Sequence, residues 1–232
     1  MTRPLAALAT LAVAFAVYSQ VVSLDLTATS DRAVAQSLAP LWREPLRALA
    51  IGVALLGGLE MTTLIAVGLA FYLIRGGFKA EAWALLALPL ATLAEVIYKR
   101  FVQHPGPFKF AHGDGPSLTM LVERGPNAIP NTYPSGHTLR TVLVYGLLAF
   151  VIFRLAPPGR RKRLAGPFAA VIIAIVAFDR LYLGVHYLSD VLAGYAAGLC
   201  WLATCLSAQA YCTNAPAARV ARLAREVTHP AP

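Results

Sequence analysis

Six runs of apolar residues divide the chain, and polar or proline-rich segments separate them. The runs cover residues 4–22, 48–74, 81–98, 138–156, 165–179 and 187–211. Most are close to the roughly 17–25 residues that a helix needs to cross a hydrocarbon core of about 30 Å. The fifth run is short, so we extend it through Arg180 and Leu181, whose polar end can reach the interface. We therefore predict an all-α, polytopic membrane protein with six transmembrane helices.

The composition favours a bilayer as solvent, because 58% of the 232 residues are hydrophobic and only 13% are charged. The length fits a single domain, residues 1–232. A net charge of +9 could suggest a nucleic-acid partner, but the positive residues lie between the apolar runs and form no stripe. Cys200, Cys205 and Cys212 lack metal-ligand spacing. We read the cysteines as buried packing residues and expect no nucleic acid.

Basic residues set the predicted orientation. The densest cluster is the run of four basic residues at 160–163, and the positive-inside tendency places it in the cytoplasm. Both termini then lie on the same side, and residues 213–232 form a cytoplasmic basic tail. Residues 1–23 look like a secretory signal but lack a clear small-x-small cleavage site, so we expect a retained first helix. The predicted location is the cell inner (plasma) membrane.

Three segments fall on the opposite side of the membrane. Residues 23–47 mix apolar and charged residues, as an interfacial amphipathic helix does. Residues 99–136 carry many prolines and glycines, which excludes a long regular element and suggests a functional loop. Residues 180–186 form a short turn. Glu60, within the second apolar run, is read either as a packing residue or as part of a proton path.

Polar residues that can do chemistry gather on this outer side. The third predicted helix ends there, the fourth begins, the fifth ends and the sixth begins. Ionisable groups at helix ends in an apolar bundle are a functional hypothesis by default. These residues are Lys99, Ser135, Gly136, His137, Arg180, His186 and Asp190.

His186 and Asp190 are four residues apart, so on a helix they share one face. The carboxylate can hold one ring nitrogen of His186, which leaves the other nitrogen as a lone pair for nucleophilic attack or general base catalysis. The alternative is a structural pair that ties two helices together.

Residues 134–137, Pro-Ser-Gly-His, precede an apolar run, and unsatisfied N–H groups at such a helix start bind anions. Ser135 can add a hydroxyl donor, or it can act only as a helix cap. The helix dipole disfavours a protonated His137 until a phosphate binds, which suggests substrate-linked acid catalysis. Lys99 and Arg180 suit phosphate oxygens, although both could instead snorkel to the interface. Glu95, four residues before Lys99, can hold it.

These residues resemble the type 2 phosphatidic acid phosphatase superfamily, which includes membrane lipid phosphatases and vanadium haloperoxidases. The family's signatures read Lys-x6-Arg-Pro, Pro-Ser-Gly-His and Ser-Arg-x5-His-x3-Asp. Residues 134–137 match the second signature, and Arg180, His186 and Asp190 match the third.

The resemblance implies that His186 attacks phosphorus to form a phosphohistidine, that His137 protonates the leaving oxygen and that Asp190 orients His186. It implies no metal and no cofactor. The substrate would be a lipid phosphate or pyrophosphate of polyprenyl or glycerophospholipid type, such as undecaprenyl pyrophosphate, at the outer face. The residues implied in phosphate binding are Lys99, Ser135, Gly136 and Arg180.

The sequence departs from the family pattern at two places. Gly106 stands where the first signature has its arginine, and Asp179 stands where the third has its serine. Losing a hydrogen bond to a charged group would weaken an enzyme by about 10- to 150-fold, from roughly 1.5–3 kcal/mol. The candidates for a compensating cation are Arg140, Arg100, His104 and Lys109, of which Arg140 follows His137 by three residues.

Three alternatives stay open from the sequence. A lipid phosphotransferase could use the same histidines and pass the group to an alcohol. A phospholipid-binding homologue could keep the anion site with little turnover. A metallohydrolase could use His137, His186 and Asp190 as ligands. The sequence names neither the lipid nor the oligomeric state.

Overall fold

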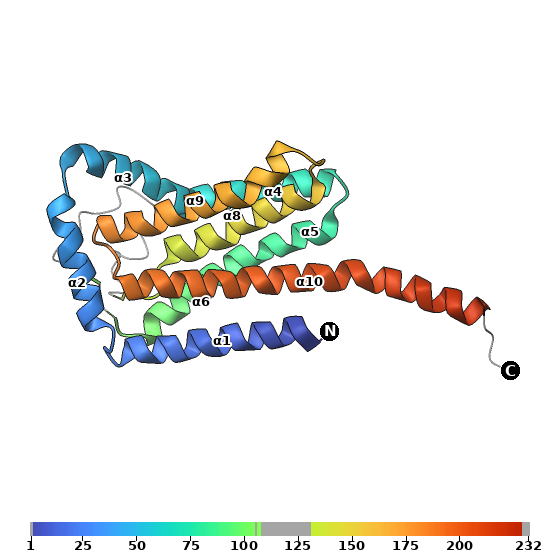
Figure 1. The fold of residues 1–232 in the computed structure, drawn as a ribbon, viewed down its shortest axis with the longest axis horizontal. Helices are drawn as coiled ribbons and strands as arrows, with labels where there is room; N and C mark the ends of the chain where they lie inside the picture. The colour runs from blue at the N-terminus through green and yellow to red at the C-terminus, as the bar shows by residue number, and fades with distance from the viewer. Residues whose placement is uncertain (1, 105, 108–130, 229–232) are drawn as a thin grey trace.

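The computed structural model describes residues 2–104, 106–107 and 131–228 of the chain. Its regular elements are helices (Figure 1). They are α1 (Thr2–Ser23), α2 (Ala28–Leu38), α3 (Glu44–Gly57), α4 (Leu59–Arg75), α5 (Lys79–Trp83), α6 (Ala87–Phe101), α8 (Gly136–Leu155), α9 (Arg160–Tyr182) and α10 (Leu188–Thr228). Short 3-10 helices follow α2 at Ala39–Leu41 and α5 at Ala84–Leu86. The predicted all-α class is confirmed.

Five helical segments among the described residues are long and apolar enough to cross a membrane, and a sixth is added if the bent pair α3 and α4 counts as one span. The fifth predicted run does extend through Arg180 and Leu181, because α9 ends at Tyr182. Large apolar side chains are exposed on the outside of the bundle, as expected where lipid replaces water. Examples are Val13, Leu64, Phe71, Leu93 and Phe168.

The second predicted run is not one straight helix, and this part of the prediction was wrong. It bends by 41° between α3 and α4. Gly57 lies so close to α8 and α9 that an added Cβ would be 2.7 Å from Val176 and 2.8 Å from Thr141. Gly58 is extended between the helices. Glu60 therefore lies in the first turn of α4 and not in the middle of a helix. The helix dipole stabilises a carboxylate in the first turn.

Close glycine contacts join α8 to α10. An added Cβ at Gly194 would lie 2.6 Å from the Ser135 carbonyl oxygen, and one at Gly198 would lie 2.7 Å from Val142. Small residues four apart allow two membrane helices to approach closely, and packing then replaces the hydrophobic effect as the source of stability. This contact places the start of α8 against the start of α10.

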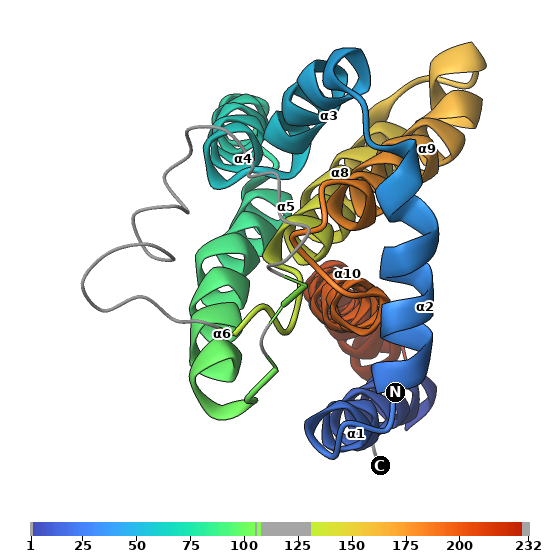
Figure 2. The same ribbon diagram turned by 90° about the vertical axis from the view of Figure 1, so that its left-hand side faces the viewer.

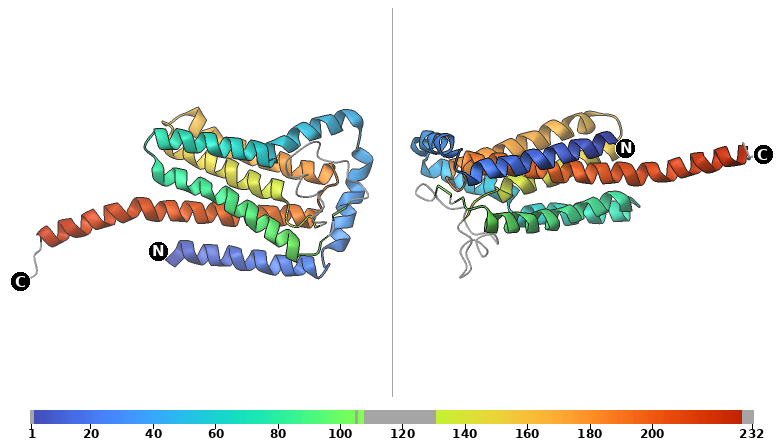
Figure 3. Two further views of the ribbon diagram at one scale, coloured as in Figure 1. Left: turned by 180° about the vertical axis from the view of Figure 1, so that it is seen from behind. Right: turned by 90° about the horizontal axis from the view of Figure 1, so that it is seen from below.

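Helix α2 crosses the end of the bundle, from α1 past α10 toward α9 (Figure 2). The segment 23–47 is thus helical in part, as predicted, but α2 buries Asp31 instead of presenting only an apolar face to lipid. At the other end, α10 continues to Thr228 and projects beyond the bundle (Figure 3). The predicted basic tail is therefore largely a helical extension of the last span.

We expect Gly198→Ala to destabilise the protein by about 1–3 kcal/mol, because the new methyl group overlaps Val142 in a well-packed contact. Thermal unfolding of the purified protein in detergent measures this. Gly68→Ala is the matched control, since Gly68 is in the middle of α4 and nothing lies within 4 Å of an added Cβ. Equal effects of the two substitutions would contradict the close α8–α10 contact.

Candidate functional site

The end of α6, the start of α8, the end of α9 and the start of α10 lie at the end of the bundle that α2 crosses (Figure 2). The predicted site residues are all buried there. Their exposed fractions do not exceed 7% for Lys99, Ser135, His137, Arg180, His186 and Asp190. A cluster of buried ionisable groups in one place needs internal partners, since isolated buried charges are costly.

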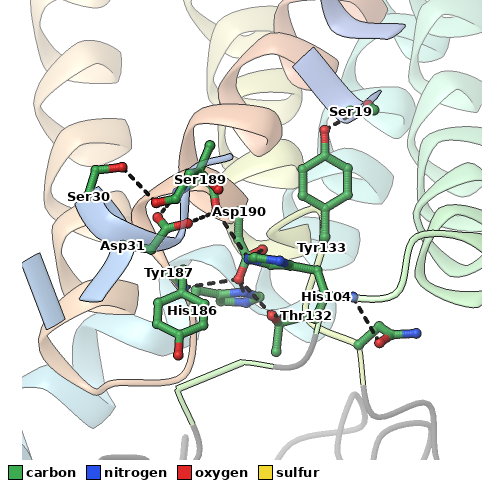
Figure 4. A network of polar contacts seen from close by, with 12 residues as sticks. Ser19, Ser30, Asp31, His104, Thr132, Tyr133, His186, Tyr187, Ser189 and Asp190 are labelled. Carbon is green, nitrogen blue, oxygen red and sulfur yellow. Dashed lines mark hydrogen bonds and ion pairs between the residues drawn. The ribbon is translucent and has the colours of Figure 1, made fainter. Parts of the chain in front are cut away.

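Asp190 is the centre of one hydrogen-bond network (Figure 4). Its Oδ2 accepts from the Thr132 hydroxyl at 2.7 Å and from the Tyr187 backbone N–H at 3.0 Å. The same oxygen lies 3.3 Å from Nδ1 of His186. The carboxylate is thus fixed by two donors in addition to the imidazole.

The spacing predicted that His186 and Asp190 share one face of a helix. They do not, because α10 begins only at Leu188. His186 lies in the preceding turn. Asp190 is the third residue of α10 and bonds back to the N–H of Tyr187, the residue before the helix, as the third residue of a capping box does. The contact therefore forms through helix capping rather than through helical spacing.

Asp31 supports the start of α10 from outside that helix. Its two carboxylate oxygens accept from the Ser189 N–H at 2.8 Å and from the Ser189 hydroxyl at 2.7 Å. A carboxylate at a helix N-terminus satisfies orphan N–H groups and suits the dipole. Sequence reasoning missed Asp31 and Ser189, because the partners are far apart in the chain and each residue alone looks like an ordinary polar residue.

His104 approaches the same network from the loop after α6. Its Nε2 lies 3.2 Å from the Ser189 hydroxyl and 3.6 Å from Oδ1 of Asp190. Its ring packs edge-on against Tyr187 and Tyr133. The sequence suggested His104 as a phosphate cation, whereas the structure turns it toward a carboxylate. Thr132, which bonds both Asp190 and the His104 carbonyl, was also missed.

The two family motifs meet through the backbone. The Ser135 N–H donates to the Asp190 carbonyl at 2.9 Å. Ser135 occupies the N-cap position of α8, but its hydroxyl makes no capping bond and instead accepts from the Thr138 hydroxyl at 3.1 Å. The reading of Ser135 as only a cap is therefore not supported, since its side chain does not cap the helix.

A second cluster surrounds Glu95 on α6. Its Oε1 lies 3.1 Å from Nζ of Lys99, and its Oε2 lies 2.5 Å from Nη1 of Arg140. The Nε of Arg140 also donates to the Gly57 carbonyl at 3.4 Å. The predicted contact between Glu95 and Lys99 is confirmed. Arg140 is buried beside it, so the cluster joins α6 to α8.

The remaining candidates occupy different positions. Arg180 forms an ion pair with Asp179, the residue that replaces the family's serine. Arg100 is exposed on α6 and does not share the buried face of Lys99. An added Cβ at Gly106 would lie 2.5 Å from Thr132, so an arginine would not fit there without a shift. Lys109, and residues 108–130 of the predicted loop, lie outside the described residues.

Comparison with known proteins shows the family of the chain. Residues 80–214, more than half of the chain, match the PAP2 superfamily, which confirms the resemblance. Over 69 residues the chain is 36% identical to phosphatidylglycerophosphatase B of Bacillus subtilis, covering 29% of this chain and 34% of that protein. Over 84 residues it is 34% identical to lipid phosphate phosphatase delta of Arabidopsis thaliana, covering 35% of this chain and 20% of that protein. The match thus spans about a third of the length of the first relative and a fifth of the second.

A solved structure has the same fold. It is the crystal structure of a transmembrane PAP2 type phosphatidylglycerolphosphate phosphatase from Bacillus subtilis, with a TM-score of 0.70 and 23% identity. The match covers 89% of this chain and 96% of that one. Together with the apolar helices, it identifies a multi-pass membrane protein.

We expect Asp31→Ala to destabilise the protein by about 1–3 kcal/mol, because the buried Ser189 N–H and hydroxyl lose their acceptor. Thermal unfolding in detergent measures the loss. Thr29→Ala, at an exposed position on the same helix, serves as the control. A melting temperature unchanged by Asp31→Ala would show that the start of α10 does not need this carboxylate.

Proposed function

Because the chain belongs to the PAP2 superfamily, we propose that it is a membrane lipid phosphatase that works through a phosphohistidine on His186. The observation that carries this proposal is the 3.3 Å contact between Nδ1 of His186 and a fixed, buried Asp190 carboxylate. A carboxylate at one ring nitrogen selects the tautomer with the proton there, which leaves Nε2 as a lone pair. A lone pair of this kind is what nucleophilic attack requires.

In the proposed reaction, Nε2 of His186 forms a bond to phosphorus while the bond from phosphorus to the leaving oxygen breaks. His137 gives its proton to that oxygen, so the lipid leaves as an alcohol, or as a phosphate monoester if the substrate is a pyrophosphate. The neutral His137 then takes a proton from water, whose oxygen attacks phosphorus and frees His186. The net reaction consumes one water and releases phosphate without a metal step.

Asp190 has an electrostatic role in this scheme. When Nε2 bonds to phosphorus, the imidazole ring gains positive charge, and an adjacent carboxylate stabilises it more strongly in a buried site than in water. The bonds from Thr132 and Tyr187 hold the carboxylate in place before the reaction. This arrangement is preorganised, so little reorganisation is needed when charge develops.

Phosphate binding is assigned to the start of α8 and to the cations around it. Helix starts offer free N–H groups and a positive dipole end to anions. Gly136 and Ser135 lie at that start, and Lys99 and Arg180 end the neighbouring helices. Of the compensating cations, burial beside Lys99 favours Arg140 over the exposed Arg100.

A lipid substrate fits the apolar surroundings. A cavity of about 860 Å³ lies between α4 and the α5–α6 segment and is lined almost entirely by apolar side chains. Val96, which lies between Glu95 and Lys99 in the sequence, is one of the residues that line this cavity. The name phosphatidylglycerophosphatase B favours a glycerophospholipid phosphate as substrate, and polyprenyl pyrophosphates such as undecaprenyl pyrophosphate are the other class.

The number of membrane spans and their orientation are part of the same proposal. We assign six spans, with α3 and α4 as one bent span, and place both termini and the basic cluster at 160–163 in the cytoplasm. The site then faces the outer side of the inner (plasma) membrane.

The purified protein should release inorganic phosphate from at least one member of a panel of phosphatidylglycerophosphate, phosphatidic acid, lipid A phosphate and undecaprenyl pyrophosphate. His186→Ala should remove activity to background, and Asp190→Asn should lower kcat on the order of 10³–10⁴-fold because the tautomer is lost. Phosphate release measured with and without EDTA should be equal.

Other results would change the assignment. Release that depends on an added alcohol acceptor would favour a phosphotransferase. Loss of activity in EDTA that returns with a metal would favour a metallohydrolase. A His186→Ala protein as active as the wild type, or a folded wild type with no turnover, would contradict the proposal.

A further inference from the structure

Glu95 lies where three features expected to hold phosphate meet. Its carboxylate contacts Lys99 at 3.1 Å and Arg140 at 2.5 Å, and it is 5% exposed. The third feature is the start of α8, since a Cβ added to Gly136 would overlap the Glu95 carboxylate directly. We infer that Glu95 is an internal anion that competes with the substrate phosphate for this position, an inference that rests on the proposed function.

The geometry at Gly136 explains why this position needs glycine. Any side chain there would displace the Glu95 carboxylate, so the backbone of α8 and the carboxylate are in direct contact. The positive end of a helix dipole and two cations form an anion site whether the anion is a carboxylate or a phosphate. In the described chain, Glu95 occupies this place.

The charges of the site support competition. Three buried cations, Lys99, Arg140 and Arg180, each contact a buried carboxylate of the chain, at Glu95 or Asp179. A phosphate that contacts Lys99 or Arg140 lies within a few ångströms of the Glu95 carboxylate, and like charges at that separation repel strongly in a buried site. Phosphate must therefore share these cations with Glu95 or displace it.

A purely structural role for Glu95 makes the opposite prediction. If Glu95 only orients Lys99 and Arg140, removing its charge leaves two buried cations without their partner and disorders the anion site. Phosphate would then bind more weakly. Competition predicts tighter binding, so the sign of the change separates the two roles.

The experiment measures the binding of inorganic phosphate to the 232-residue protein in detergent, by the dependence of melting temperature on phosphate concentration and by product inhibition. Glu95→Gln keeps the shape and removes the charge. We expect phosphate to bind about tenfold or more tightly, since a charged hydrogen bond is freed on each cation. Unchanged or weaker binding would overturn the inference.

Two further variants keep the test decisive. Glu81→Gln is the matched control, because Glu81 on α5 is similarly buried and pairs with Arg154 at 3.1 Å, away from the site. The phosphate affinity of the Glu81→Gln protein should equal that of the wild type. If it tightens binding as much as Glu95→Gln, net charge alone is responsible and the inference fails. If Glu95→Gln does not fold, Glu95→Asp, with a carboxylate withdrawn by one methylene, should bind phosphate more tightly than the wild type, and weaker or equal binding overturns the inference.

The binding measurement is separate from turnover. A wild type that hydrolyses no lipid phosphate while Glu95→Gln binds phosphate more tightly would reject the proposed reaction and keep the competing anion. If the wild type hydrolyses a lipid phosphate but Glu95→Gln binds phosphate no more tightly, the proposed reaction is kept and the competing anion is rejected.

Discussion

A buried carboxylate at the start of α10 connects the parts of the site. Asp190 is fully buried, and burying a charge costs several kcal/mol unless hydrogen bonds replace its water. The Thr132 hydroxyl and the Tyr187 N–H supply these bonds, and His186 shares the same oxygen. The backbone carbonyl of Asp190 also holds Ser135. Fixing this one residue therefore fixes the histidine and the start of α8 together.

Packing of the bundle makes that arrangement possible. Gly194 and Gly198 let α8 and α10 approach closely, and Gly57 lets the bent α3 approach α8 and α9. Where α8 begins, the Glu95 carboxylate pairs with both Lys99 and Arg140 in an apolar surrounding. The same closeness that stabilises helices in lipid thus brings cations, imidazoles and the N-terminus of α8 into one place.

The sequence predicted the convergence of four helix ends, because successive membrane helices alternate in direction and alternate loops share one side. It also paired His186 with Asp190 and Glu95 with Lys99, since both pairs are four residues apart. It did not predict the bend at Gly58, because the apolar run continues through it. Asp31 and Thr132 could not be found, and His104 was suggested only as a phosphate cation, since the network partners of these residues lie 58 to 158 residues away and only tertiary packing joins them.

In the proposed reaction, His186 carries the phosphoryl group during turnover. The most direct test is to mix the enzyme with a ³²P-labelled lipid phosphate and to quench the reaction rapidly without acid. Peptide mapping then locates the label. We expect an acid-labile, base-stable phosphoramidate on the peptide that contains His186, and no such label in the His186→Ala protein. Label on another residue, or phosphate release with no labelled enzyme under conditions that slow hydrolysis of the intermediate, would contradict it.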